Sequence, residues 1–296
     1  MIKQTLYFSN PAYLSLSNAQ LVIKRGDGLD TETRPIEDIG VILLDHPQIT
    51  LTHGLINALL SNKSAIISCD RLHLPSGLML PIKGHTEQSK RYRIQVNSSQ
   101  ALKNNLWQQT VIAKIKNQRR VLDIYQKPSK RLSILSKRVI SGDPSNIEGQ
   151  AAAYYWSTLL GRDFKRERDG EPPNGLLNYG YAILRSLVAR ALSSSGLMVT
   201  HGIHHRNKYN AYCLADDIME PYRPFVDIAV ADLYLNQNVE SFLNIESKKT
   251  LLSIGQVDAY FGKLKRPLMV GLSSTTASLY HCYEGTKRKI IYPKIP

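Results

Sequence analysis

The residues best suited to chemistry lie between positions 201 and 227, in the segment HGIHHRNKYNAYCLADDIMEPYRPFVD. A histidine pair comes first, and two aspartates, a glutamate and a third aspartate follow it. Imidazole and carboxylate groups together suit a divalent cation such as magnesium or manganese, and no thiolate pair accompanies them to indicate structural zinc. Neighbouring arginines and a lysine add positive charge. The segment therefore predicts a site that holds a metal ion together with an anion, most often a phosphate.

The acids of this segment share a helical turn. Asp217 and Glu220 are three residues apart and would lie on one face of that turn. Pro221 is disfavoured deep inside a helix, so both acids should lie near a helix start or a kink. The macrodipole favours carboxylates there, and we expect Asp216 to be a cap. The histidines His204 and His205 are adjacent, so both cannot point into one site.

A further acid, Glu148, lies in the first turn of a helix predicted from residue 147 onward. Ser145 or Asn146 can cap that helix. Two alanines and Tyr155 follow Glu148 on the same helical face, where small side chains let a neighbouring backbone come close. From this motif alone, a capping acid is favoured over a buried ligand.

The charge of the chain favours a polyanionic partner. Its 296 residues carry a formal net charge of +14. The stretch from Lys83 to Arg138 holds 14 lysines and arginines against two acids, with apolar residues at helical spacing. We expect basic helices that contact phosphates, with weaker DNA-binding candidates at Arg119, Arg120, Lys130 and Arg131. The basic last residues, TKRKIIYPKIP, are expected to be a flexible arm.

Several classes of protein find no support in the sequence. The three cysteines are far apart and form no CxxC pair, which argues against a disulfide framework. The N-terminal residues lack the apolar stretch of a signal peptide, and no apolar run approaches a membrane span. No Walker motif indicates a nucleotide cofactor. We expect a soluble, cytoplasmic protein without a membrane partner.

The elements that must position these residues predict an α+β fold. Short apolar runs separated by turn residues fill the first 80 positions, and one short helix pattern occurs near Leu55. Strand patterns nearly vanish after residue 83 until the last third of the chain. We expect a strand-rich β-domain over 1–82, a linker over 83–90 and a larger, mainly α-helical catalytic domain over 91–296.

Three segments make the chain similar to the CRISPR-associated spacer integrases, the Cas-one family, in particular its type II branch. They are NIEGQAAAYYW at 146–156, NGLLNYGYAIL at 174–184, and GIHH…LADDIMEPYRPFVD ending at Asp227. The resemblance covers nearly the whole chain. It implies that the catalytic residues and metal ligands are Glu148, His205 and Glu220, with Asp217, Lys208 and Arg223 as supporting residues. Asn178 is a further supporting candidate from the sequence itself, because a polar group in an apolar helix needs a partner: it either supports a neighbouring site or pairs with Tyr181.

The same resemblance implies a function. The protein would use magnesium or manganese to join the 3′-hydroxyl ends of short duplex DNA, the new spacers, to a CRISPR repeat. It would act as a homodimer, with a dimer of the small Cas-two protein bridging two such dimers. Two alternatives stay open: a plain metal-dependent, structure-specific DNA nuclease that uses water, and a non-catalytic DNA-architectural protein that needs only the basic helices.

Overall fold

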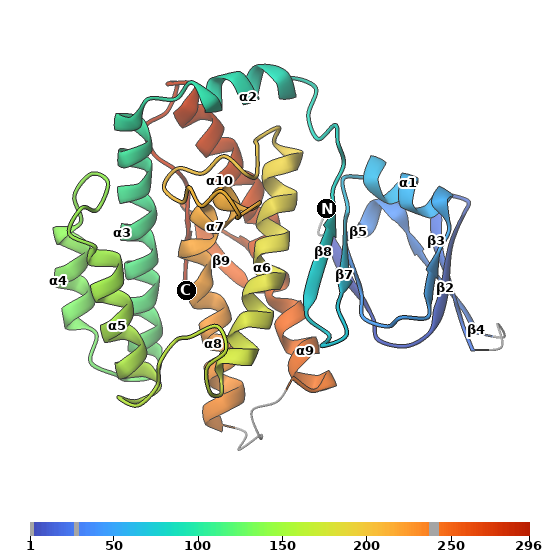
Figure 1. The fold of residues 1–296 in the computed structure, drawn as a ribbon, viewed down its shortest axis with the longest axis horizontal. Coiled ribbons are helices and arrows are strands. Elements are labelled where there is room, and N and C mark those ends of the chain that lie inside the picture. The colour runs from blue at the N-terminus through green and yellow to red at the C-terminus, as the bar shows by residue number, and fades with distance from the viewer. Residues whose placement is uncertain (1–2, 27–29, 237–242) are drawn as a thin grey trace. The chain divides into compact units, whose positions relative to one another are not determined.

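The computed structural model describes residues 3–26, 30–236 and 243–296. It divides the chain into two compact units, Met1–Thr86 and Glu87–Pro296 (Figure 1). The first unit is rich in strands and the second is mainly helical. The predicted α+β class, with a strand-rich start and a larger helical remainder, is confirmed.

The first unit contains two four-stranded sheets. One sheet has the order β1 (Gln4–Phe8), β5 (Ile39–Leu44), β7 (Ala65–Cys69) and β8 (Pro75–Met79). The other has the order β4 (Asp30–Pro35), β3 (Gln20–Arg25), β2 (Ala12–Ser17) and β6 (Ile49–Leu51). The short 3₁₀ turn η1 (Ile36–Asp38) precedes β5, and helix α1 (His53–Ser61) precedes β7.

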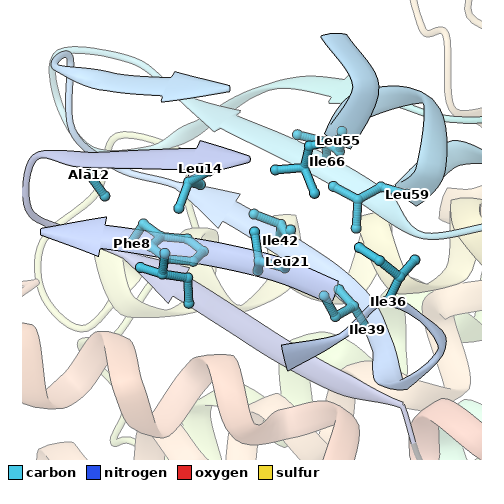
Figure 2. Packing of buried hydrophobic residues seen from close by; sticks show 11 residues of the cluster. Phe8, Ala12, Leu14, Leu21, Ile36, Ile39, Ile42, Leu55, Leu59 and Ile66 are labelled. Carbon is cyan, nitrogen blue, oxygen red and sulfur yellow. The ribbon is translucent and has the colours of Figure 1, made fainter. Parts of the chain in front are cut away.

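An apolar core holds the described part of this unit together. Figure 2 shows Leu14 and Leu21 of one sheet, Ile42 of the other, and Leu55 and Leu59 of α1 gathered in it. All five are fully buried, and burial of apolar area is the main force that stabilises such a core. The five apolar runs and the short helix expected from the sequence occur as β1, β2, β3, β5, β7 and α1.

The second unit is built mainly from helices. Its helices are α2 (Gln88–Val96), α3 (Gln100–Ile124), α4 (Lys130–Arg138), α5 (Ile147–Leu159), α6 (Asn174–Ser194), α7 (Cys213–Met219), α8 (Arg223–Asn236), α9 (Ile245–Leu252) and α10 (Leu268–Tyr283). The 3₁₀ turns η2 (Glu220–Tyr222) and η3 (Ser253–Gln256) and a small sheet of β10 (Leu264–Pro267), β9 (Asp258–Phe261) and β11 (Pro293–Lys294) complete it.

Helix α3 carries Lys114, a residue of the candidate active site. It packs against α4, α5, α8 and η2, and the green part of Figure 1 shows α3, α4 and α5 side by side. Its buried face repeats at helical spacing through Trp107, Val111, Ile115 and Leu122. Lys114 lies on the same buried face, so α3 carries one cation into the interior.

The basic C-terminal segment is packed rather than flexible, so that expectation is wrong. Ile290, Tyr292 and Ile295 are buried. The hydroxyl groups of Tyr292 and Thr110 lie 2.7 Å apart, and the side-chain amide of Asn117 donates to the carbonyl of Pro293 at 3.0 Å. The segment lies along α3 because these three apolar side chains turn inward, whereas its four basic residues are exposed.

No helix within the described ranges is long and apolar enough to cross a membrane.

Candidate active site

Two glutamates that are distant in the sequence meet at one lysine ammonium. Glu148 Oε1 and Glu220 Oε2 each lie 2.5 Å from Lys114 Nζ. The side chains of Lys114 and Glu220 are only 10% and 5% exposed, so water screens these ion pairs weakly. Burial opposes the charge on Lys114, but the two carboxylates outweigh burial and raise its pKa. Helices α3 and α5 and the turn η2 therefore converge on one charged cluster.

The start of α5 leaves Glu148 free to reach α3. Asn146 is the N-cap, as predicted, and its side-chain oxygen accepts from the Gly149 amide at 3.0 Å. Asp143, which the sequence did not single out, accepts from the amides of Ile147 and Glu148 at 2.9 Å each. The capping role favoured for Glu148 is wrong because these two residues already satisfy the helix start.

Glu220 is held by a second cation. Arg223 Nε lies 2.9 Å from Glu220 Oε1, and the Arg223 guanidinium lies 4.6 Å from the centre of the Tyr181 ring. Burial disfavours the charged form of Glu220, but Arg223 and Lys114 hold its pKa below the usual value. Within the described part of the chain, Glu220 Oε2 and Arg223 Nε have no hydrogen-bond partner of regular geometry. Both atoms lie in ion pairs instead, Oε2 with Lys114 at 2.5 Å and Nε with Glu220 Oε1 at 2.9 Å.

Asp217 holds the loop that carries the histidines. Its Oδ2 accepts from the amides of Ile203 and His204 at 2.6 and 2.9 Å, and its Oδ1 lies 2.6 Å from His205 Nδ1. A carboxylate can only accept, so this contact fixes the proton on Nδ1. The same bond raises the pKa of His205 against the effect of burial. Asp217 is fully buried, and its oxygens are already occupied.

The two histidines differ in their surroundings. The ring of His204 stacks on Trp107, with centroids 4.2 Å apart and planes 4° from parallel. Burial lowers the pKa of His204. Trp107 meets His205 by its edge instead, with centroids 5.8 Å apart. His204 packs against α3, whereas Asp217 orients His205, a distinction that spacing alone did not supply.

A fourth carboxylate of the site, Asp227, lies near the charges of Arg223 and Lys114. It is buried and accepts from the hydroxyls of Tyr155 and Tyr181 at 2.9 and 2.5 Å. Burial raises the pKa of Asp227 to about 6.

An added Cβ on Gly180 would lie 2.5 Å from a Val226 methyl group, so α6 and α8 approach too closely for a larger residue.

Other residues singled out from the sequence lie elsewhere. Asp216 pairs with Arg185 at 2.6 Å rather than capping α7, because that acid faces a neighbouring helix. Asn178 bonds Arg166 at 2.7 Å and the carbonyl of Arg168 at 2.5 Å, and so ties the 166–168 loop to α6.

Lys208 and the four weaker candidates for DNA binding are on the surface. The ammonium of Lys208 lies 4.8 Å from the Tyr209 ring centre, among exposed residues. Arg131 lies over Tyr154, with 5.1 Å to the ring centre. The exposed candidates for phosphate contact are Lys208, Arg119, Arg120, Lys130 and Arg131.

The donor chemistry fits a divalent cation, although the described ranges contain no group of three His, Cys, Asp or Glu side chains already placed to hold one. The structure brings Glu148 and Glu220 together across a cation, and hard divalent ions prefer such carboxylate oxygens. His205 is oriented through Nδ1 by a carboxylate, as metal-binding histidines usually are, which leaves Nε2 for a ligand. Convergence of all three on one ion stays a prediction.

Besides Asp143, sequence reasoning missed the roles of Lys114 and Asp227. Lys114 was one of many lysines in a basic stretch. The only signal that set it apart is its position on the buried face of α3. Asp227 was counted among the acids of the central segment, but its tyrosine partners lie 72 and 46 residues away along the chain. No local spacing could show either arrangement.

Known proteins share this architecture. A structure described as "Casposase bound to integration product" covers 98% of this chain and 92% of its own, with a TM-score of 0.80 and 19% identity. A "Cas6-RT-Cas1--Cas2 complex" covers 99% of this chain and 36% of its own, with a TM-score of 0.76 and 22% identity. At these identities the likeness shows the fold.

The sequence comparisons show the family. The "CRISPR-associated endonuclease Cas1" of Neisseria meningitidis serogroup C (strain 8013) is 38% identical over 254 residues, which are 85% of this chain and 83% of that protein. The family model described as "CRISPR associated protein Cas1" matches residues 6–264. The chain belongs to the Cas1 family of CRISPR-associated proteins.

Proposed function

We propose that this protein is a metal-dependent DNA strand-transfer enzyme of CRISPR adaptation, which joins 3′-hydroxyl ends of short duplex DNA to a repeat. The observation that carries the proposal is the meeting of Glu148 and Glu220 at one buried cation. A non-catalytic DNA-binding protein would have no need of two carboxylates held together at this cost in repulsion and desolvation. The relative from Neisseria meningitidis, named an endonuclease, supports the assignment.

Each residue of the cluster has a distinct task. Glu148, Glu220 and His205 would hold magnesium or manganese, which supplies Lewis-acid polarisation of the phosphate and a lower pKa for the attacking hydroxyl. Lys114, which pairs with both glutamates, would be free to contact the phosphate if those carboxylates held a metal ion instead. Arg223 stays fixed over the Tyr181 ring and faces the negative charge that develops during transfer.

Tyr155 and Tyr181, the two tyrosines beside the cluster, are not placed to act as nucleophiles. Burial raises the pKa of Tyr155 and that of Tyr181 well above the usual value, and both hydroxyls donate to Asp227. Direct transesterification therefore fits the site better than a covalent protein–DNA intermediate. In that reaction the 3′-oxygen of the donor bonds to the target phosphorus, the P–O bond to the target's 3′-oxygen breaks, and that oxygen gains a proton.

The proposed partners follow from the family. The protein would act as a homodimer on duplex DNA, with a Cas2 dimer bridging two such dimers. The likeness to a complex whose description names both Cas1 and Cas2 supports this assembly. The 38% identity to the Neisseria meningitidis protein supports the type II branch.

The test separates strand transfer from hydrolysis. A short duplex donor with free 3′-hydroxyls is incubated with a repeat-bearing target, Cas2 and manganese or magnesium, and covalent joining is followed on a denaturing gel. A donor that ends in dideoxynucleotides should bind equally well and fail to join. Glu220→Gln should abolish joining and keep DNA binding. Target cleavage at full rate with the dideoxy donor would mean that water is the nucleophile and that the protein is a nuclease.

A further inference from the structure

Arg166 lies in the loop between α5 and α6, and neutral oxygens orient its guanidinium. Its Nη1 donates to the carbonyl of Glu167 at 2.7 Å and to Asn174 Oδ1 at 2.9 Å. Its Nη2 donates to Asn178 Oδ1 at 2.7 Å. No carboxylate among the described residues forms an ion pair with Arg166. Its positive charge therefore lacks a local counter-charge in the part of the chain that the structure describes.

The guanidinium of Arg166 keeps two hydrogen-bond donors for a ligand. Arginine has five N–H groups in a planar fork, and the three contacts above use both N–H groups of Nη1 and one of Nη2. The Nε–H and the second N–H of Nη2 have no acceptor among the described residues, and the side chain is only half-buried. A cationic fork with two free donors matches two oxygens of a phosphate. Arg166 thus has the chemistry of an anion receptor.

Arg166 borders the proposed catalytic cluster. The centre of the Tyr181 ring lies 5.3 Å from the guanidinium carbon of Arg166 and 4.6 Å from that of Arg223. Arg223 pairs with Glu220 at 2.9 Å, so the two arginines differ in that only Arg166 lacks a carboxylate partner. Successive phosphates of a DNA strand follow at a rise of roughly 3.4 Å. A strand whose transferring phosphate faces Arg223 therefore brings a neighbouring phosphate within reach of Arg166.

Helix α6 fixes the position of this arginine. Asn174 and Asn178 are four residues apart and so lie on one face at the start of α6. Asn174 is 1% exposed, and its amide nitrogen donates to the carbonyls of Lys165 and Glu171 at 2.9 and 2.8 Å. The helix thus holds both the loop backbone and the guanidinium of Arg166. A charge placed in advance in this way needs little reorganisation when an anion binds.

We propose that Arg166 is a substrate-binding residue of the strand-transfer site, which holds a DNA phosphate adjacent to the one that reacts. The inference rests on the proposed function, which supplies that DNA. The adjacent phosphate belongs either to the donor, next to its 3′ end, or to the target, next to the scissile linkage. Holding it keeps the attacking oxygen in line with the target phosphorus, and orientation of this kind contributes strongly to the rate.

Single-turnover joining with Cas2 and manganese, at saturating donor and target, tests this role. Arg166→Gln should slow joining by about tenfold to hundredfold, the loss expected when a charged hydrogen-bond donor is removed. The matched control is Arg168→Gln, which removes the same charge from the same loop. The side chain of Arg168 is exposed and has no hydrogen bond or ion pair among the described residues, so this variant should join like wild type.

Neutral methylphosphonate linkages identify the phosphate that Arg166 contacts. They are placed one at a time near the 3′ end of the donor and on both sides of the scissile linkage of the target. In wild type and in Arg168→Gln, one such substitution in one of the strands should slow joining. In Arg166→Gln the same substitution should have no further effect, because the contact is already lost. A purely structural role of Arg166 would leave the two effects additive.

The outcomes separate the role of Arg166 from the proposed function. Joining by Arg166→Gln at the rate of Arg168→Gln would overturn the proposal for Arg166, and so would additive losses at every substituted linkage. Wild type with unmodified DNA tests the proposed function by itself. If wild type joined no donor, the proposed function would fail. If wild type joined donors and Arg166→Gln joined them equally fast, only the role of Arg166 would fail.

Discussion

Lys114 lies between two carboxylates that would otherwise repel each other. Replacing it by methionine keeps much of the side-chain volume and leaves Glu148 and Glu220 without the ammonium. Removing one partner of a buried ion pair costs about 3–5 kcal/mol, so Lys114→Met should be clearly less stable without metal. A divalent cation that bound the freed carboxylates would restore stability by mass action.

Thermal unfolding with and without manganese therefore measures the relation of Lys114 to the metal. We expect the manganese-induced rise in Tm to be larger for Lys114→Met than for wild type, although strand joining falls. The control is Lys116→Met, two positions along α3 on its exposed side. An equal rise in both variants would contradict the view that Lys114 occupies the place of the metal.

Asp227 predicts a pH dependence of stability. Burial raises its pKa from the ordinary value of 3.8 to about 6 in the folded protein, so the folded state binds the proton more tightly. The folded state thus has an advantage that is complete below pH 4 and is lost as the pH rises through about 6. At about 1.4 kcal/mol per pKa unit, the loss is of the order of 3 kcal/mol. Urea unfolding between pH 4 and 7 should show this decline in wild type and not in Asp227→Asn; parallel curves would contradict it.

The loop at 201–205 is an element whose backbone is shaped around one carboxylate. A Cβ added to Gly202 would lie 2.8 Å from Asp217 Oδ2 and 3.1 Å from Cys213 Cβ. Gly202→Ala should therefore push the loop away from Asp217 and turn His205 out of its position. We expect weaker manganese binding, by about tenfold or more, since loss of the partners that orient a metal ligand typically costs 10–100-fold.

Gly175→Ala is the matched control for this prediction. Gly175 is in the first turn of α6, and nothing lies within 4 Å of its added Cβ. Alanine favours a helix over glycine by up to about 1 kcal/mol, so this variant should be at least as stable as wild type and should bind manganese normally. Isothermal titration with manganese compares the two, and equal affinities would show that the Gly202 loop does not position a ligand.

At the scale of the whole molecule, local signals predicted local structure. Alternating apolar runs predicted five of the strands of the first unit, whereas β4, a polar DTETRP, and β6, only three residues long, carried too little pattern. The resemblance to the family implied Glu148, His205 and Glu220 as ligands, which stays a prediction, and it did not indicate the Lys114 contact, which joins positions 34 residues apart in the sequence. Such contacts depend on how α3 packs against α5 and η2, which no short window of sequence contains.

The C-terminal segment also shows that composition alone does not predict tertiary packing. Its basic composition is typical of a mobile arm, and the expectation of flexibility followed from it. The segment is held instead by side chains of α3, among them Gln109, Asn117 and Arg120. The basic residues of the segment are exposed and can attract anions, whereas its buried apolar residues fix it on α3.

Charge over the whole molecule gives the last prediction. The net charge is +14, and the stretch from Lys83 to Arg138 alone holds 14 lysines and arginines against two acids. Phosphate contacts release condensed counterions, so duplex affinity should fall by about 10³–10⁵ between roughly 50 and 200 mM salt if 6–10 contacts form. Arg119→Gln with Arg120→Gln should reduce the slope of log K against log salt by about 1.8, at roughly 0.9 per contact. Glu148→Gln removes a carboxylate from the cluster without removing a surface cation, so its slope should match wild type. Affinity that does not change over this range of salt would show that these basic helices do not contact the DNA backbone.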